Sequence, residues 1–124
     1  MGKFKELRDM LQSDLSVVGV PVMQGWLIHA EPPCVLLSPP IGGAYVSEAK
    51  EFGAVTLNID VVVLVLATPR DRARDALDDL LEAVLRNSMD WALQNVDPPG
   101  TAALPDSTIE FYGTVVHLGK SVQL

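Results

Sequence analysis

A histidine, a glutamate and a thiol lie close together near residue 30, and side chains of these types are the usual ligands of zinc. The segment from His29 to Cys34 superficially matches the zinc-deaminase signature, in which a His-x-Glu pair and a Pro-Cys-x-x-Cys run supply the ligands and the general acid. The match fails because the two halves must lie well apart on two helices, and because the second cysteine position holds Leu37. We therefore expect no metal site here, and a histidine and a thiol that are packed or half-exposed near a strand.

His117 is the second histidine, and a positioned histidine is the commonest general base of enzymes. No serine, cysteine or acidic residue lies next to it in the sequence, so any partner must come from a distant segment that the fold brings near. Cys34 is the single cysteine, which excludes an intramolecular disulfide and a four-thiolate zinc site. Gly42 and Gly43 lack the following lysine of a phosphate-binding loop and indicate a turn. We expect a structural histidine, and no catalytic residue, metal or cofactor.

Acidic side chains crowd one face of a predicted helix: Asp71, Asp75, Asp78, Asp79 and Glu82. Paired carboxylates can bind a divalent cation or act as general acid and base. The spacing favours a solvated face, because Asp71 is stabilised by the helix dipole and because Arg74–Asp78 and Glu82–Arg86 have the four-residue spacing of surface ion pairs. An electrostatic role for this face is the second interpretation.

The composition is that of one folded, acidic domain. Of the 124 residues, 48% are hydrophobic and 20% are charged, which is close to the globular average. The net charge of -7 repels phosphate and argues against tight nucleic-acid binding, although a surface can pass close to DNA without holding it. Residues 1–10 lack the apolar run of a signal peptide, and the apolar stretch 61–67 is shorter than the about twenty residues of a membrane-spanning helix. We expect a reducing cytoplasm and no membrane role.

Apolar periodicity and the positions of proline and glycine predict the order of elements. These are a helix over 4–18, a short strand over 34–38, a loop or hairpin over 39–53, a strand over 55–66, a helix over 69–87 and a strand over 109–118. The first helix should end near Gly19. Residues 20–33, where Trp26 to Ile28 are either a short strand or a loop, and 88–108, an irregular proline-rich stretch, are left unassigned. The order predicts an α+β fold, a small mixed or antiparallel sheet flanked by two main helices, as a single domain over residues 1–124.

The strand over 55–66 is apolar on one face along its whole length and on the other face only in its second half. Thr56, Asn58 and Asp60 make that other face polar at its start, before Val62, Leu64 and Leu66. A strand that becomes apolar on both faces must be covered there by another element or by another subunit.

The helix that follows has a compact start signal and an apolar stripe. We expect Thr68 as its N-cap, Pro69 as its first helical residue and Asp71 in the position of a capping-box acid. The expected stripe is Ala73, Ala76, Leu77, Leu80, Leu81, Val84 and Leu85.

Over nearly its whole length the chain resembles the tail terminator proteins of long-tailed, non-contractile phages, particularly those of actinobacterial hosts. The features that carry the resemblance are a leading helix through Leu7, Leu11 and Leu15, the Pro-Pro-Cys-Val-Leu-Leu-Ser-Pro run at 32–39, Gly53 before a Val-rich strand at 54–67, Pro69 before Ala-Leu-Asp-Asp-Leu at 76–80, and Phe-Tyr-Gly at 111–113. The segments around Trp26 and Trp91 depart from this pattern. These are patterns of packing, and a neighbouring head–tail connector protein of the phage neck is the alternative.

The resemblance implies a sheet flanked by helices that assembles as a ring of six subunits on the last ring of the tail tube. There the ring ends tube growth and joins the tube to the head connector. The implied partners are further copies of the chain, the major tail tube protein and the head–tail connector protein. The implied location is the head-proximal end of the virion tail, after assembly in the host cytoplasm. No catalytic residues are implied.

Two sets of residues are candidates for this role. The acidic channel-face candidates are Asp75, Asp78, Asp79 and Glu82, since carboxylates that line a ring repel phosphate and let DNA pass without specific binding. The candidates for an assembly loop within 40–53, mobile in the free subunit and ordered on a partner, are Gly42, Gly43, Tyr45, Glu48, Lys50 and Phe52. The alternative for this segment is a hairpin already folded onto its own domain. A small-molecule-binding domain or an enzyme needs convergent polar groups, and the sequence offers only scattered ones.

Overall fold

The computed structural model describes residues 2–25, 31–40, 42–49, 52–103 and 110–124. The helices are α1 (Lys3–Leu15), the short 3-10 helix η1 (Ser16–Val18) and α2 (Arg70–Arg86), and the strands are β1 (Val22–Gln24), β2 (Cys34–Ser38), β3 (Val46–Glu48), β4 (Ala54–Leu66), β5 (Ala92–Val96), β6 (Gly100–Ala103) and β7 (Glu110–Gln123). The predicted α+β class is confirmed, with more strands than the sequence indicated. None of the described helices is long and apolar enough to span a bilayer.

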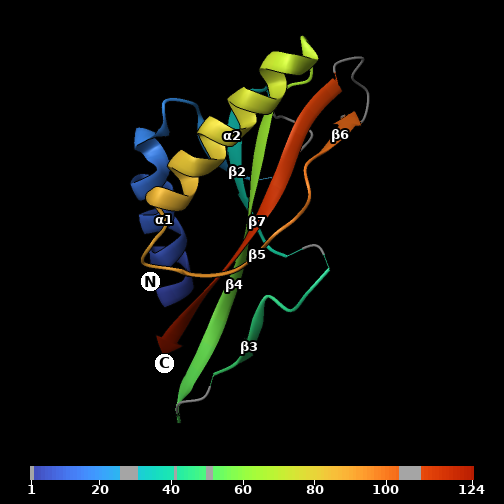
Figure 1. The fold of residues 1–124 in the computed structure, drawn as a ribbon. Helices are drawn as coiled ribbons and strands as arrows, with labels where there is room; N and C mark the ends of the chain where they lie inside the picture. Colours follow the sequence, from blue (N-terminus) through green and yellow to red (C-terminus); the bar gives the residue numbers. More distant parts are fainter. Residues whose placement is uncertain (1, 26–30, 41, 50–51, 104–109) are drawn as a thin grey trace.

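The strands form one mixed sheet in the order β1-β2-β4-β7-β5, with β3 paired to β4 and β6 paired to β7. Among the described strand pairs, β1 with β2 is the one parallel pair. The two longest strands, β4 and β7, run antiparallel side by side from Ala54 opposite Gln123 to Leu66 opposite Phe111 (Figure 1). This pair is the centre of the sheet and fixes which residues face each other.

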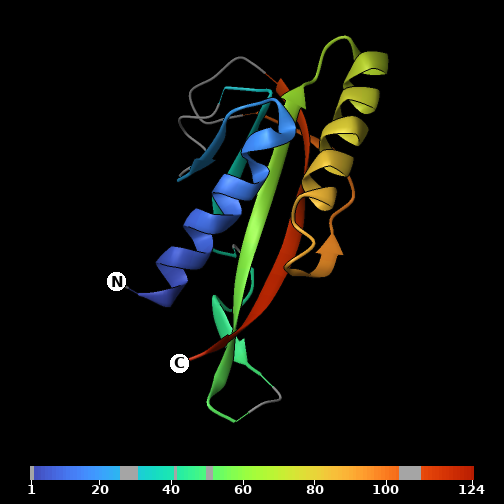
Figure 2. The same ribbon diagram turned by 90° about the vertical axis from the view of Figure 1, so that its left-hand side faces the viewer.

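Both helices cover the same face of the sheet, and the main core lies between them and the strands (Figure 2). The odd-numbered residues of β4 from Leu57 to Val65 point into this core, together with Leu11 and Leu15 of α1 and Leu77 of α2. Their alternation is the period-two pattern of a strand with one covered face. The chain leaves α1 through η1 and turns at Gly19, whose φ of 87° is the left-handed conformation expected of it.

The opposite face of the sheet carries a second, smaller apolar cluster. Cys34 and Leu36 of β2, Val62 and Leu64 of β4, and Phe111 of β7 form it, and all five are buried. The prediction that the second half of β4 is buried on both faces is therefore confirmed at Val62 and Leu64, but Leu66, at the end of the strand, is exposed. The first half of this face, around Asn58 and Asp60, is polar and buried.

The start of α2 differs from the prediction. The N-cap is Pro69 and not Thr68, the first helical residue is Arg70, and no side chain caps the helix. Proline fixes φ but leaves ψ free, and Pro69 takes an extended ψ of 146° where the chain leaves β4, so it lies outside the helix. Its carbonyl accepts the first helical hydrogen bond from the Ala73 N–H. The apolar stripe is confirmed with one exception, since Ala76 is exposed.

Two strands occur where the sequence indicated irregular structure. β5 and β6 both pair with β7, and the break between them is the Asp97-Pro98-Pro99 run. β5 lies at the edge of the sheet, and its side chains from Ala92 to Asn95 are exposed, so it has no apolar face that could mark it in the sequence. The final strand was predicted over 109–118 and extends to Gln123, and Ile109 lies outside the described residues. Trp26 to Ile28 also lie outside them.

Candidate functional site

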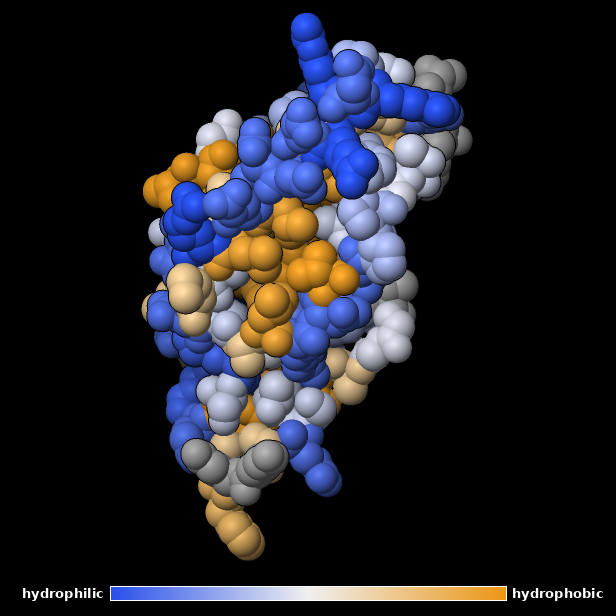
Figure 3. Space-filling model, viewed as in Figure 1, coloured by the Kyte–Doolittle hydropathy of each residue, from blue (hydrophilic) through white to orange (hydrophobic). Residues whose placement is uncertain are grey.

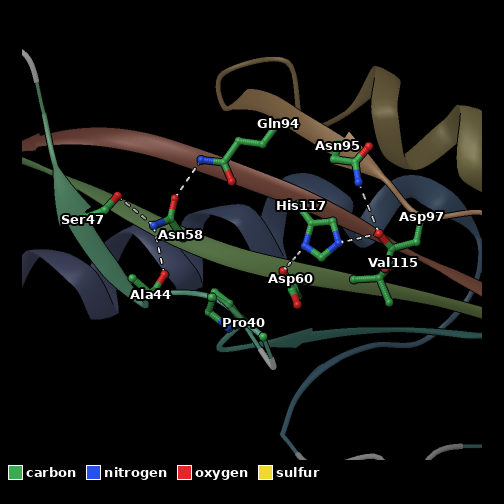
Figure 4. A pocket seen from close by; sticks show the side chains of 12 residues that line it. Pro40, Ala44, Ser47, Asn58, Asp60, Gln94, Asn95, Asp97, Val115 and His117 are labelled. Carbon is green, nitrogen blue, oxygen red and sulfur yellow. Dashed lines mark hydrogen bonds and ion pairs between the residues drawn. The ribbon is translucent and has the colours of Figure 1, made fainter.

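The sheet face opposite the two helices has a polar half, and there a histidine lies between two carboxylates (Figure 4). His117 of β7 lies directly opposite Asp60 of β4, and its Nδ1 is 2.6 Å from Asp60 Oδ1. Its Nε2 is 2.9 Å from Oδ1 of Asp97, the residue that follows β5. The two acids lie 57 and 20 residues away in the sequence, so the fold supplies the partners that the sequence around His117 lacks.

Hydrogen bonds of its backbone N–H and carbonyl groups hold Asp97 in place. Its N–H donates to the Val115 carbonyl at 3.0 Å, and its own carbonyl accepts from Thr114 Oγ1 at 2.5 Å. The register of β5 on β7 shifts between Leu93 and Asn95, which is the local irregularity of a β-bulge. This shift places Asn95 opposite His117 and brings Asp97 alongside the imidazole.

A second polar group lies beside the first, centred on Asn58. The Asn58 Nδ2 donates to the Ala44 carbonyl and to Ser47 Oγ, each at 3.0 Å, while Asn58 Oδ1 accepts from Gln94 Nε2 at 2.8 Å. The Asn58 amide thus connects β4 to Ala44, to Ser47 of β3 and to Gln94 of β5. These hydrogen bonds satisfy a side chain that is only 9% exposed.

These two groups line an open pocket of about 800 Å³. Its lining residues come from four parts of the chain: Pro40, Gly42, Gly43, Ala44 and Ser47; Asn58 and Asp60; Gln94, Asn95 and Asp97; and Val115 and His117. The sequence offered polar groups that were scattered, and the pairing of β4 with β7 and of β7 with β5 brings them together. The sequence signal for this pocket was weak, and consisted of an aspartate and an asparagine on a largely apolar strand.

The environment of His117 favours its charged form. Burial by itself lowers the pKa of His117, but hydrogen bonds to Asp97 and Asp60, together with the charges of both carboxylates, outweigh burial and raise the pKa above its ordinary value. A carboxylate only accepts hydrogen bonds, so two carboxylates at the two ring nitrogens require both nitrogens to donate. The geometry and the electrostatics both indicate an imidazolium.

The arrangement is a poor fit to hydrolytic chemistry. A general base needs a ring nitrogen with a free lone pair, and here both nitrogens face carboxylates. Ser47 is the hydroxyl of this pocket, and it accepts a hydrogen bond from Asn58, with no contact to His117 among the described interactions. The residues that the structure describes include no group of three or more histidine, cysteine or acidic side chains arranged to hold a metal.

The segment from His29 to Cys34, which superficially matched a zinc site, lies only partly within the described residues. His29 lies outside them. Cys34 is fully buried in the smaller apolar cluster, beside Leu64 and Phe111. Burial raises the pKa of the Cys34 thiol, and a hydrogen bond with the Glu31 backbone offsets part of this rise. The thiol is therefore a packed apolar group.

The acidic channel-face candidates all lie on the exposed side of α2, away from the sheet. Asp75, Asp78, Asp79 and Glu82 are exposed, as predicted for a solvated face. Of the two predicted ion pairs, Glu82–Arg86 forms, at 2.7 Å, and it is the only one of the two among the described ion pairs. A role of this face in a channel stays a prediction.

The assembly-loop candidates divide into several environments. Gly42 and Gly43 are exposed and line the polar pocket, while Glu48 lies in β3. Tyr45 packs against the main core, with its ring edge-on to Phe4 at 6.3 Å between centroids, so it is already covered within the subunit. Phe52 is fully exposed near the tip of the hairpin between β3 and β4, and Lys50 lies outside the described residues.

The pairing of β3 with β4 is the hairpin that the sequence left as the alternative for residues 40–53. The hairpin extends beyond the region that the two helices cover (Figures 1 and 2). Whether part of it is an assembly element stays a prediction.

A shallow apolar groove lies between the end of α2 and β5, and hydrophobic side chains gather there on the surface (Figure 3). Its apolar lining residues are Leu85, Met89, Trp91, Leu93 and Leu118, and Glu82, Arg86 and Ser88 lie at its rim. Met89 is 80% exposed and Leu93 is 55% exposed. The sequence analysis missed this groove, because β5 was not recognised as a strand.

Comparison of the chain with known protein families finds no family model that matches, and comparison with curated protein sequences finds no match either.

Proposed function

We propose that this chain is a structural subunit that assembles into a ring, and that the ring is the tail terminator of a long-tailed phage. The observation that carries the proposal is the apolar groove formed by Leu85, Met89 and Leu93 at β5, which is an edge strand of the described sheet. Exposed apolar side chains next to free strand hydrogen-bonding groups are typical of a surface that another chain covers.

A second exposed apolar feature, a protruding side chain, lies on another part of the subunit than the groove. Phe52 is fully exposed near the tip of the β3–β4 hairpin, whereas the groove lies beside β5 and the end of α2. A contact between two unlike surfaces of identical subunits is head-to-tail, and such contacts produce a ring when the rotation closes. In the proposed ring the hairpin tip of one subunit lies against the groove of the next. The family resemblance implies six subunits.

The acidic face of α2 supports the same proposal. Asp75, Asp78 and Asp79 are exposed on the side of the helix that faces away from the sheet. In a ring through which DNA passes, carboxylates toward the lumen repel phosphate and prevent the DNA from being retained. The ring then caps the tail tube and contacts the head connector on its other side.

Multi-angle light scattering and negative-stain electron microscopy of the purified chain test the proposal. We expect a ring with about six times the monomer mass. Leu93→Ser and Phe52→Ser should each shift the chain toward monomer. Val17→Ser is the matched control, since Val17 of η1 is also an exposed apolar residue, 71% exposed, and is not among the residues that line the groove.

A tube-binding assay separates the tail terminator from other ring proteins. The chain is mixed with polymerised tail tube protein, and electron microscopy shows where it binds. The proposal expects density at one end of each tube and shorter tubes when the chain is present during polymerisation. A chain that stays monomeric and leaves tube length unchanged contradicts the proposal and favours an adaptor of the phage neck.

The polar pocket favours a second candidate, a domain that binds a small polar molecule. Asn58, Gln94, Asp60, Asp97 and His117 converge on a pocket of about 800 Å³, a size suited to a small ligand. A thermal-shift screen of polar metabolites tests this function. A hit that raises the melting temperature of the native chain and loses its effect in Gln94→Ala supports it, while a flat screen leaves the assembly role preferred.

A further inference from the structure

We propose that His117 is a protonation-dependent clamp, closed through contacts to Asp60 and Asp97, that fastens the edge strand β5 to the centre of the sheet. The inference concerns the conformation of the subunit and stands whether or not the chain forms a ring. It begins from the two contacts of the imidazole, Nδ1 to Asp60 Oδ1 at 2.6 Å and Nε2 to Asp97 Oδ1 at 2.9 Å.

Only the protonated ring can make both contacts as hydrogen bonds. A carboxylate has no proton to donate, and a neutral imidazole has one N–H and one lone pair. When the ring loses a proton, one nitrogen presents its lone pair to a carboxylate oxygen, and that contact becomes repulsive. The loss of one proton therefore opens one of the two contacts.

Among the described residues that line the pocket, His117 is the one that can carry a positive charge. The charged groups that face it are Asp60 from β4 and Asp97 from the end of β5, and the neighbouring Asn95 side chain is neutral and donates to Asp97 at 3.3 Å. The described residues on the remaining sides of the pocket, from Pro40 to Ser47 and Val115, carry no charge. The protonated ring is thus a positive charge that the two acids share.

The contact that opens is the one to Asp97. The Asp60 side chain is 4% exposed and lies directly opposite His117 in the central strand pair, so it cannot leave without losing its hydrogen bonds in a buried position. The Asp97 side chain is 43% exposed and can turn to water. The neutral ring therefore keeps its N–H on Asp60 and releases Asp97.

Release of Asp97 affects β5 because this strand lies at the edge of the described sheet, where its paired neighbour is β7. Its residues from Ala92 to Asn95 are exposed, and its register is interrupted at Gln94. Asp97 follows β5 directly, and its backbone bonds to Val115 and Thr114 fasten the end of the strand. Trp91, 6% exposed in the main core, bounds the segment on the other side. The segment that opens is therefore 92–97.

The direction of the pH dependence follows from the raised pKa of His117, in which the effect of burial is outweighed by the hydrogen bonds to Asp97 and Asp60 and by their charges. The clamp is closed below the ordinary histidine pKa of 6.5 and opens as the pH rises through the higher pKa of the folded chain. At higher pH, β5 should exchange its amide protons more readily.

Two NMR measurements on the intact chain test the clamp. Nitrogen-15 shifts of the imidazole give the midpoint of the His117 titration, and hydrogen exchange gives protection factors, corrected for intrinsic exchange at each pH. We expect both ring nitrogens to be protonated at low pH and the midpoint to lie above that of an exposed histidine. The protection of the Asp97 amide and of β5 should fall about tenfold across this midpoint. Amides in the centre of β4 should not change.

Variants distinguish the clamp from a general effect of pH. Asp97→Asn should lower the His117 midpoint and reduce the pH dependence of β5 protection, and His117→Gln should abolish that dependence. His29→Gln, which removes the other histidine, is the control and should behave as the native chain. A native His117 midpoint at or below that of an exposed histidine, or β5 protection that does not change across the midpoint, overturns the proposal. The proposal is also overturned if the protection of β5 in His117→Gln changes with pH as much as it does in the native chain.

Discussion

His117 and Asp60 face each other across the two central strands, with Nδ1 of the imidazole 2.6 Å from Oδ1 of a carboxylate that is almost completely buried. Side chains alternate between the faces of a strand, so a slip of one residue between β4 and β7 would separate the pair and turn one of the two toward the helix-covered core. A buried charge in an apolar environment is costly without its partner. The pair therefore helps to specify the register of the sheet as well as to stabilise it.

The contribution of the pair to stability should depend on pH in one direction. The folded pKa of His117 is raised, so the stabilisation is fully present below the ordinary pKa of 6.5 and is lost as the pH rises through the folded pKa. We expect Asp60→Asn to lower the free energy of unfolding by about 1–3 kcal/mol in mildly acidic buffer, and by less in alkaline buffer.

Urea denaturation at about pH 6 and about pH 9, on either side of the His117 titration, measures this difference. Asp90→Asn is the control, because Asp90 is exposed and makes none of the described ion pairs. If the free energy of unfolding falls by the same amount between the two pH values in Asp60→Asn and in the native chain, the pair of His117 and Asp60 is not the source of the pH dependence.

The acidic face of α2 should tolerate charge reversal. Asp75, Asp78 and Asp79 are exposed, so changing all three to lysine should leave the circular dichroism spectrum unchanged and cost about 1 kcal/mol through the helix dipole. Each change adds two units of charge, which brings the formal net charge from -7 to -1. We expect stronger retention of DNA in a filter-binding assay at low salt. The control with the opposite change of charge replaces the exposed Arg70 and Arg72 of the same helix with glutamate. Unfolding of the triple lysine variant would show that the three carboxylates are structural.

The Cys34 thiol should react slowly in the native chain. It is fully buried and burial raises its pKa, and both effects reduce the fraction of accessible thiolate. A chromogenic disulfide reagent should therefore label the native chain at least about a hundredfold more slowly than the urea-unfolded chain, because labelling requires transient opening. Cys34→Ala should keep the oligomeric state of the native chain and bind no less zinc than the native chain. Rapid native labelling would place the thiol at the surface and contradict the packed position.

Gly113 should be sensitive to any added side chain. A Cβ at this position would lie 2.6 Å from the Val63 carbonyl oxygen and 2.6 Å from Leu64 Cδ2, and the carbonyl belongs to the central strand and cannot move freely. We expect Gly113→Ala to destabilise the chain by about 1–3 kcal/mol. Gly100→Ala is the control, because Gly100 is also in a strand paired with β7 and has no atom within 4 Å of the added carbon. Equal melting temperatures for the two variants would contradict the described packing.

The elements with a strong apolar period were predictable from the sequence. β4 alternates from Leu57 to Val65, and α2 repeats apolar residues at three- and four-residue spacing, because each element covers one face of a single core. Gly19 marked the end of the first helical segment through its left-handed backbone. β5 was missed because its exposed side chains carry no such pattern, and β3 was left as an alternative because three paired residues are too few to show one.

The sequence by itself determined the α+β class, the two helices, the central strands and the exposed acidic face of α2, since these depend on local periodicity and on the burial of apolar side chains. The tertiary structure decided where the polar groups meet. Asp60, Asp97 and His117 are far apart in the chain, and only the register of β4 on β7 and the shifted register of β5 bring them within hydrogen-bonding distance. Strand pairing joins residues at any sequence separation, and therefore no local pattern around His117 could have named its partners.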